Sequence, residues 1–275
     1  MLTIVSITVF LFVTFASASK NRIVGGMDAI PHEFPYLISL QYMDVNESHH
    51  FCGGTIIKDN YVLTAAHCIR KDDAFISKVQ VVAGAHDFLN KNGHEQTRTI
   101  ASRVMHENYK GGVGPYDIGI IKLSSPFKLN KKVKVATLPP ANFNATGLAR
   151  ISGWGYISED YSDIRPKVLQ KGMMKILNDT RCRELWGKES MYHDTNICAN
   201  QIKGLTAVCK GDSGGPLSQK LAGFVEYVIG VTSWAHYPCN KKINRQFSWK
   251  RLYLSIGLIN IRNKAFKYSH CVKIS

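Results

Sequence analysis

The stretch Gly211-Asp212-Ser213-Gly214-Gly215-Pro216 sets one serine among glycines. Glycine adopts backbone conformations that other residues avoid, so Ser213 can lie on a tight turn with its hydroxyl exposed and backbone N–H groups close by. Such N–H groups can stabilise an oxyanion, and a neighbouring base would make the hydroxyl a good nucleophile. Whether Ser213 is a reactive serine or an ordinary turn residue therefore depends on the partners that the rest of the chain offers.

Two other stretches offer a base and an acid. Leu63-Thr64-Ala65-Ala66-His67-Cys68 places His67 at the end of a strand-like run, and Tyr116-Asp117-Ile118 places Asp117 where another apolar run begins. Taken singly, the ordinary interpretation of His67 is a buried core histidine, and that of Asp117 is a residue that caps the end of a strand. Taken together with Ser213, in that chain order, they indicate a base, an acid that orients it and a nucleophile.

The rest of the chain favours an all-β fold. Short apolar runs occur at 36–40, 55–57, 61–64, 79–82, 118–123 and 227–231, separated by Gly, Pro, Asn and Asp. Many short runs with frequent turn residues are typical of β-barrels and sandwiches. A helix is expected over 181–186, after the polar residues 178–180.

The N-terminus predicts export. Residues 2–18 are uncharged and apolar or small, and they end in Ala16-Ser17-Ala18, so residues 1–18 are interpreted as a signal peptide. A membrane anchor is the alternative, but the run is shorter than the ~20 apolar residues that span a bilayer. A secreted chain would pair its cysteines and could carry N-glycans. The seven cysteines allow many pairings by count alone, and the glycan acceptors are Asn46, Asn144 and Asn178.

The charge is unevenly distributed. The formal net charge is +15, but residues 240–275 hold nine Lys or Arg and no Asp or Glu, which leaves +6 for the first 239 residues. A mildly basic, solvated surface accounts for that remainder. No compact basic cluster occurs, so the sequence predicts no nucleic-acid partner.

The combined motifs resemble those of the chymotrypsin-like (trypsin-fold) serine proteases. The resemblance covers residues 22–239 and rests on Arg22-Ile23-Val24-Gly25-Gly26, TAAHC at 64–68, DIGIIKL at 117–123, SGWG at 152–155, GDSGGP at 211–216 and Ser233-Trp234. It implies two six-stranded antiparallel β-barrels with the active site between them. It also implies that His67 is the general base, that Asp117 orients it, that Ser213 is the nucleophile, and that the N–H groups of Gly211 and Ser213 form the oxyanion hole. The implied disulfides are Cys52–Cys68, Cys182–Cys198 and Cys209–Cys239.

The resemblance further implies a zymogen. Residues 19–22 would be a short propeptide, and cleavage after Arg22 would free the amine of Ile23 to pair with Asp212. The protease domain would then be residues 23–239. Loss of the ammonium charge at strongly alkaline pH would be expected to lower the activity.

The enzyme is expected to cleave after apolar residues of its substrate. The position where trypsins carry an aspartate is Ala207, followed by Val208, and Ser-Trp is followed by Ala235. The substrate-binding residues implied are Ala207, Val208, Lys210, Ser233, Trp234 and Ala235, with Lys210 favouring acidic substrate neighbours. A trypsin-like partner would then be needed to cleave at Arg22. We expect protein or peptide substrates, protein protease inhibitors, a monomer, no cofactor, and no metal, because Ala85 stands where some members have an acidic calcium ligand.

The tail at residues 240–275 departs from the family. It lacks the Pro-Gly-Val-Tyr strand and the terminal helix with Trp-Ile, so we expect an unpaired strand edge in the second barrel. A change of reading frame from about Lys241 is our preferred interpretation, and a genuine basic extension that binds glycans is the other. If the pocket wall is missing, the chain would be a catalytically impaired homologue that acts by binding, which is the alternative to a secreted endopeptidase.

Overall fold

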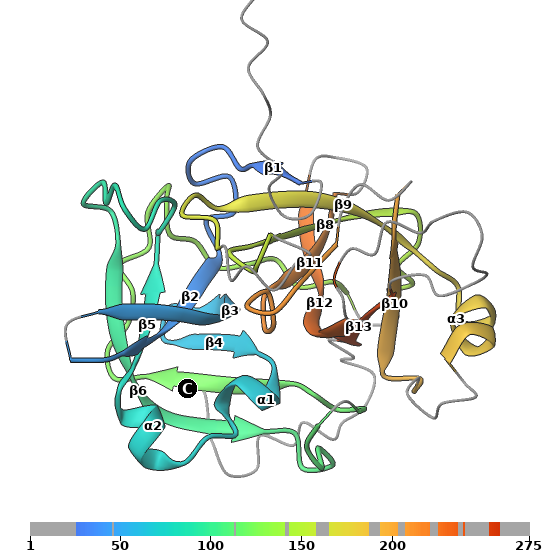
Figure 1. Ribbon diagram of the computed structural model, residues 1–275, viewed down its shortest axis with the longest axis horizontal. Coiled ribbons are helices and arrows are strands. Elements are labelled where there is room, and N and C mark those ends of the chain that lie inside the picture. Colours follow the sequence, from blue (N-terminus) through green and yellow to red (C-terminus); the bar gives the residue numbers. More distant parts are fainter. Residues whose placement is uncertain are drawn as a thin grey trace, which may run out of the picture.

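The computed structural model describes residues 26–45, 47–112, 114–140, 143–157, 165–186, 193–202, 207–220, 225–235, 239 and 253–258, the last by its backbone. The expected signal peptide, Arg22, Ile23 and Asn46 lie outside these ranges. Strands dominate, and Figure 1 shows them in two groups, with α1 (Ala66–Ile69) on the side of the first group that faces the second. Among the described residues, no helix is long and apolar enough to cross a bilayer.

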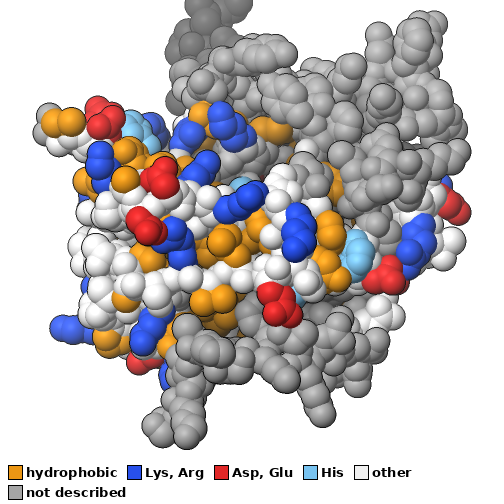
Figure 2. All heavy atoms as spheres, turned by 90° about the horizontal axis from the view of Figure 1, so that it is seen from below, with side chains coloured by type: hydrophobic (Ala, Val, Ile, Leu, Met, Phe, Trp, Pro, Cys, Tyr) orange, Lys and Arg blue, Asp and Glu red, His pale blue; other side chains and the backbone are white. Residues whose placement is uncertain are grey.

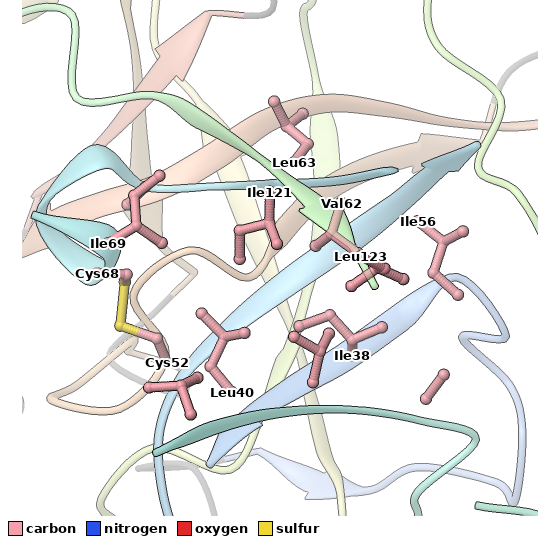
Figure 3. Packing of buried hydrophobic residues seen from close by; sticks show 14 of the residues in the cluster. Ile38, Leu40, Cys52, Ile56, Val62, Leu63, Cys68, Ile69, Ile121 and Leu123 are labelled. Carbon is pink, nitrogen blue, oxygen red and sulfur yellow. A yellow bond between two sulfur atoms is a disulfide. The ribbon is translucent and has the colours of Figure 1, made fainter. Parts of the chain in front are cut away.

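The first group is a closed barrel of six antiparallel strands in the order β2-β3-β4-β7-β6-β5. Alternating side chains point inward, and Ile38, Leu40, Ile56, Val62 and Ile121 are fully buried in its core (Figure 3). This interior fixes the strand register, because a shift by one residue would expose the apolar side chains. The strands are β2 (Leu37–Met43), β3 (Ser48–Lys58), β4 (Tyr61–Thr64), β5 (Val79–Ala83), β6 (Gln96–Met105) and β7 (Gly119–Leu123).

The second group has seven strands, and six of them hydrogen-bond in a closed ring. The sheet order is β1-β9-β10-β13-β12-β11-β8, and β8 also pairs with β9, which closes the ring. Its core contains Ile151, Met174, Leu217 and Ile229. The two barrels expected from the sequence are therefore present. The strands are β1 (Met27–Asp28), β8 (Leu148–Gly153), β9 (Gln170–Ile176), β10 (Asn196–Gln201), β11 (Pro216–Lys220), β12 (Glu226–Ala235) and β13 (Tyr253–Leu258).

Strand β13 corrects the expectation of an open barrel edge. Its backbone pairs with β10 from Asn196 to Asn200 and with β12 from Gly230 to Ala235. Strand pairing uses backbone N–H and C=O groups, so a tail without the family motif can still occupy the gap. The stretch Tyr253-Leu254-Ser255-Ile256-Gly257-Leu258 also has the aromatic and aliphatic content of a strand.

Local sequence signals located some elements and missed others. The run 61–64 coincides with β4, whereas β6 escaped detection because it is a partly exposed strand with the polar sequence QTRTIASRVM. His67 does not end a strand as expected, because β4 ends at Thr64 and His67 lies in the short helix α1. The expected helix is α3 (Asp179–Trp186), and the Asn178 side chain accepts the Arg181 N–H at 2.8 Å, as an N-cap does.

A mostly buried ion network joins the N-terminal segment to the second barrel. Arg150 donates hydrogen bonds to Glu33 at 2.8 Å and to Glu226 at 2.5 Å, and Lys171 donates to Glu33 at 2.6 Å. The four side chains are only 14–19% exposed. Removal of Arg150 would leave Glu226 without its cation in a poorly solvated site, whereas Glu33 would keep its hydrogen bond from Lys171.

We expect Arg150→Ala to lower the free energy of unfolding by about 3–5 kcal/mol, since it leaves the mostly buried Glu226 carboxylate without its cation. Denaturant unfolding of the intact chain would measure this. The matched control is Arg103→Ala, because Arg103 pairs with an Asp73 side chain that is 92% exposed. That change should cost about 1 kcal/mol or less. Equal, small losses in both variants would contradict a stabilising role for the network.

Candidate active site

A histidine and a buried aspartate form the centre of the site. The Asp117 carboxylate is 1% exposed, lies 2.7 Å from His67 Nδ1 through Oδ2, and accepts the His67 backbone N–H at 2.9 Å through Oδ1. The Thr64–Gly119 pairing of β4 with β7 brings the two chain segments together. An acceptor on Nδ1 leaves Nε2 unprotonated in the neutral ring, which is the state that can accept a proton.

Ser233 completes the environment of this aspartate. Its hydroxyl donates to Asp117 Oδ2 at 2.5 Å, across from the second barrel. The sequence placed Ser233 only in the wall of the substrate pocket and missed this contact. The available signal was a hydroxyl residue shortly after the apolar run Val228–Val231, because a buried hydroxyl needs an acceptor.

The turn that carries Ser213 is held between the barrels. Gly53 N–H donates to the Ser213 carbonyl at 2.7 Å, and Gly214 N–H donates to the Thr232 carbonyl at 2.7 Å. Gly214 has φ +78°, and a Cβ there would lie 2.4 Å from the Gly53 oxygen, so only glycine fits. Within the described residues there is no hydrogen bond between Ser213 and His67, whose Nε2 lies 3.6 Å from Cys68 Sγ. Nucleophile and base often draw together only when substrate binds.

The neighbouring backbone is shaped to bind an anion. Gly211 has φ +102°. Within the described part of the chain, neither the Gly211 N–H nor the Ser213 N–H has an acceptor. The Gly211 carbonyl is held from behind by His50 Nε2 at 2.9 Å, and Ser39 Oγ lies 2.8 Å from His50 Nδ1. Burial lowers the pKa of His50 to about 4, so it is neutral at pH 7. Sequence reasoning missed both His50 and Ser39.

Asp212 is a buried acid without a cation among the described residues. Its carboxylate accepts N–H groups from Gly155 at 2.8 Å and Cys209 at 2.9 Å. Burial raises the pKa of Asp212 to about 6, although these two hydrogen bonds act in the opposite direction. A positive charge brought to this carboxylate would therefore be strongly favoured.

A hollow opens next to Ser213. Of the residues expected to bind substrate, Val208, Lys210, Ser233, Trp234 and Ala235 line it. Ala207 is 1% exposed and is not among the described lining residues. No Asp or Glu lines the hollow within the described ranges. The other lining residues are Cys209, Thr232 and Cys239.

The remaining expected features concern cysteines, glycans and metals. The three disulfides implied by the resemblance are all present in the structure: Cys52–Cys68, Cys182–Cys198 and Cys209–Cys239. Asn144 and Asn178 are exposed, as glycan acceptors must be. The one group of three potential metal ligands among the described residues is Cys52, His67 and Cys68. Its two sulfurs are bonded to each other and cannot act as thiolates, so it provides no metal site.

Comparisons with known proteins agree with this geometry. A family model described as Trypsin matches residues 23–250. Trypsin-1 of Astacus astacus is 39% identical over 79% of this chain and 90% of its own length. Trypsin of Sus scrofa is 34% identical over 83% of this chain and 90% of its own length. A protein named Lectizyme, from Glossina austeni, is 33% identical over 80% of this chain and 78% of its own length.

Proposed function

Because the chain belongs to the trypsin family of serine endopeptidases, we propose that it is a secreted protease that cuts proteins and peptides after apolar residues, once cleavage after Arg22 has activated it. The observation that supports this most is the hydrogen-bonded pair of His67 and Asp117 beside a Ser213 turn whose hollow has no described acidic lining residue. The active protease would begin at Ile23 and include residues 23–239.

The geometry suggests how each group acts. His67 removes the proton of the Ser213 hydroxyl as the serine oxygen attacks the scissile carbonyl carbon. The carbonyl oxygen becomes negatively charged, and the N–H groups of Gly211 and Ser213 stabilise it. His67 then protonates the departing amine, and a water molecule repeats the sequence to release the acid. Asp117, held by Ser233 and the His67 backbone, keeps the imidazole oriented and stabilises its charged form.

The pocket chemistry supports apolar specificity. An ammonium or guanidinium group in the hollow would lose its hydration without gaining a carboxylate, which is strongly unfavourable. An apolar side chain loses no polar contacts there, and the Val208 side chain would limit its size. This specificity also implies that a different, trypsin-like protease cleaves after Arg22, because Arg22 itself is basic.

Activation is proposed to act through Asp212. The ammonium group of a freed Ile23 would pair with the buried Asp212 carboxylate and fix the adjacent peptide units at residues 210–213, which we call the oxyanion loop. The raised pKa of Asp212 supports the proposal, because it indicates that the carboxylate lacks sufficient compensation among the described residues. Secretion, occupied glycan sites, a monomeric state and inhibition by protein protease inhibitors belong to the same proposal.

A series of peptides tests the specificity directly. The protein cleaved after Arg22 should hydrolyse substrates with Phe or Leu before the scissile bond at least about 100-fold faster, in kcat/KM, than otherwise identical substrates with Lys or Arg. Sequencing the products by mass spectrometry would locate each cut. Preferential cleavage after Lys or Arg would contradict the apolar assignment, while leaving the endopeptidase activity intact.

The alternative, an impaired homologue that acts by binding, has lost one of its supports. It rests on a missing strand of the second barrel, whereas the backbone of β13 pairs on both sides. On the face that Figure 2 shows, Lys and Arg side chains are scattered among acidic and apolar ones, so the described residues of this face offer little support for glycan binding. Our proposal that the tail beyond about Lys241 arises from a shifted reading frame is tested by sequencing the transcript.

A further inference from the structure

Two cationic side chains lie against one tyrosine next to the oxyanion loop. The Arg165 guanidinium carbon is 4.4 Å, and the Lys210 Nζ 5.7 Å, from the centroid of the Tyr156 ring. Arg165 also donates to the Tyr156 hydroxyl at 2.7 Å and to the backbone carbonyl of His50. The Tyr156 N–H donates to the Lys210 carbonyl at 3.0 Å. We call Tyr156, Arg165 and Lys210 the cation–tyrosine cluster.

The charge of this cluster is not neutralised by the described residues. Within the described ranges, neither Arg165 nor Lys210 forms an ion pair with a carboxylate. The ring binds the two cations through its π face, which restricts their positions without cancelling their charge. Lys210 is exposed, and it lines the same hollow as Ser213. Two positive charges therefore lie against the same tyrosine ring at the edge of the active site.

The contacts of the cluster show which part of a substrate would reach it. The residue before the scissile bond enters the hollow, which is lined by residues 208–210, by Ser213 and by the end of β12. Arg165 instead donates a hydrogen bond to the backbone carbonyl of His50 in β3. Two residues further along β3, Cys52 forms a disulfide with Cys68, which is the neighbour of His67 in the sequence. His67 protonates the departing amine, so the leaving half of the substrate must pass this side. The cluster thus borders the path of the residues that follow the scissile bond.

We propose that the cation–tyrosine cluster recognises an acidic side chain in one of the first two residues after the scissile bond. This inference rests on the proposed endopeptidase function and adds a second specificity determinant to it. A carboxylate there would meet a guanidinium that offers paired N–H donors and an ammonium that offers a mobile one. The preferred cleavage sites would accordingly combine an apolar residue before the bond with Asp or Glu shortly after it.

Matched peptides test the proposal in the activated enzyme. Each pair would share one apolar residue before the scissile bond and carry Asp or Asn at the first or the second position after it. At low salt, the Asp peptide of one pair should be cleaved about 10-fold faster in kcat/KM than its Asn partner. This ratio should shrink in 1 M NaCl, where charges are screened within about 3 Å.

Variants assign the effect to the cluster. Lys210→Gln and Arg165→Gln should each bring the Asp/Asn ratio toward one. Lys122→Gln makes the same change of charge at an exposed position of β7 in the first barrel and should leave the ratio unchanged. Equal ratios in the parent and in both cluster variants would overturn the proposal. So would a parent ratio of one at both positions after the scissile bond.

A binding measurement separates this proposal from the catalytic one. The Ser213→Ala variant of the cleaved protein binds peptides without hydrolysing them, and calorimetry would give the Kd of each Asp and Asn peptide. About 10-fold tighter binding of an Asp peptide would support the cluster assignment even if the parent proved inactive. Equal Kd values for every pair would reject it even in a fully active protease.

Discussion

Asp117→Asn is expected to lower kcat of the activated protein by about 10⁴-fold, the loss known for the same change in this family. Asp117 accepts from His67 Nδ1 and from the His67 backbone N–H. An asparagine amide can offer its NH₂ group to Nδ1, which would place the ring proton on Nε2. Nε2 could then no longer accept the proton of Ser213. Steady-state hydrolysis of an apolar peptide measures the loss.

Ser233→Ala is the comparison for this variant. It removes one hydrogen bond to the same carboxylate but leaves the histidine tautomer intact. A hydrogen bond to a charged group contributes about 1.5–3 kcal/mol, so we expect a loss of about 10- to 100-fold. If Asp117→Asn were as mild as Ser233→Ala, orientation of His67 by Asp117 would not be essential to the reaction.

The second large effect is expected at Asp212. In the protein cleaved after Arg22, Asp212→Asn would remove the proposed partner of the Ile23 ammonium. Breaking a buried ion pair costs about 3–5 kcal/mol, which corresponds to a loss of about 10²- to 10⁴-fold in kcat/KM if the pair orders the oxyanion loop. Activity that survives Asp212→Asn, or chemical acetylation of the new amine, would contradict this activation mechanism.

The stability of the uncleaved precursor gives an independent test of Asp212. The folded-state pKa of about 6 exceeds the ~3.9 of an exposed aspartate, so the folded state holds this proton more tightly than the unfolded state. The contribution of Asp212 to stability therefore falls, by about 2 kcal/mol, as the pH rises from 4 to 6. His50 opposes this change. Its pKa is lowered to about 4, so its contribution is complete above about pH 6.5 and is lost as the pH falls.

The difference between two precursors isolates the aspartate. Both would carry Arg22→Gln to prevent cleavage, and one would also carry Asp212→Asn. Because His50 contributes equally to both, the Asn variant should become about 2–3 kcal/mol more stable relative to its parent between pH 4 and pH 7. Urea unfolding at the two pH values measures this, and a difference that does not depend on pH would show that Asp212 is not a destabilised acid.

The sequence predicts the three catalytic residues better than the residues that hold them in place. His67, Asp117 and Ser213 lie in short motifs whose residue types are dictated by the reaction, so each could be identified from the neighbouring letters. His50, Ser39 and the second role of Ser233 act through contacts between segments far apart in the chain. Such contacts leave no local pattern, because the sequence around a buried polar residue does not show which distant residue is its partner.

The same division holds for the fold. Buried strands such as β4 can be predicted from their apolar runs, whereas β6 cannot, because most of its residues are polar or partly exposed. The short helix α1 has no amphipathic period to detect, since it spans only four residues. The closing strand β13 was missed because the tail was compared with a family motif, while the barrel requires only a segment able to pair its backbone on both sides.

Covalent labelling of Ser213 tests the central claim most directly. The full chain would be cleaved after Arg22 by a trypsin-like protease, treated with a phosphonate ester bearing an apolar side chain, and digested for mass spectrometry. The account predicts one added phosphonyl group, located on Ser213, with labelling lost in His67→Ala and absent before cleavage. A folded, cleaved protein that remains unlabelled at Ser213 would show that the assembled residues do not form a working serine protease.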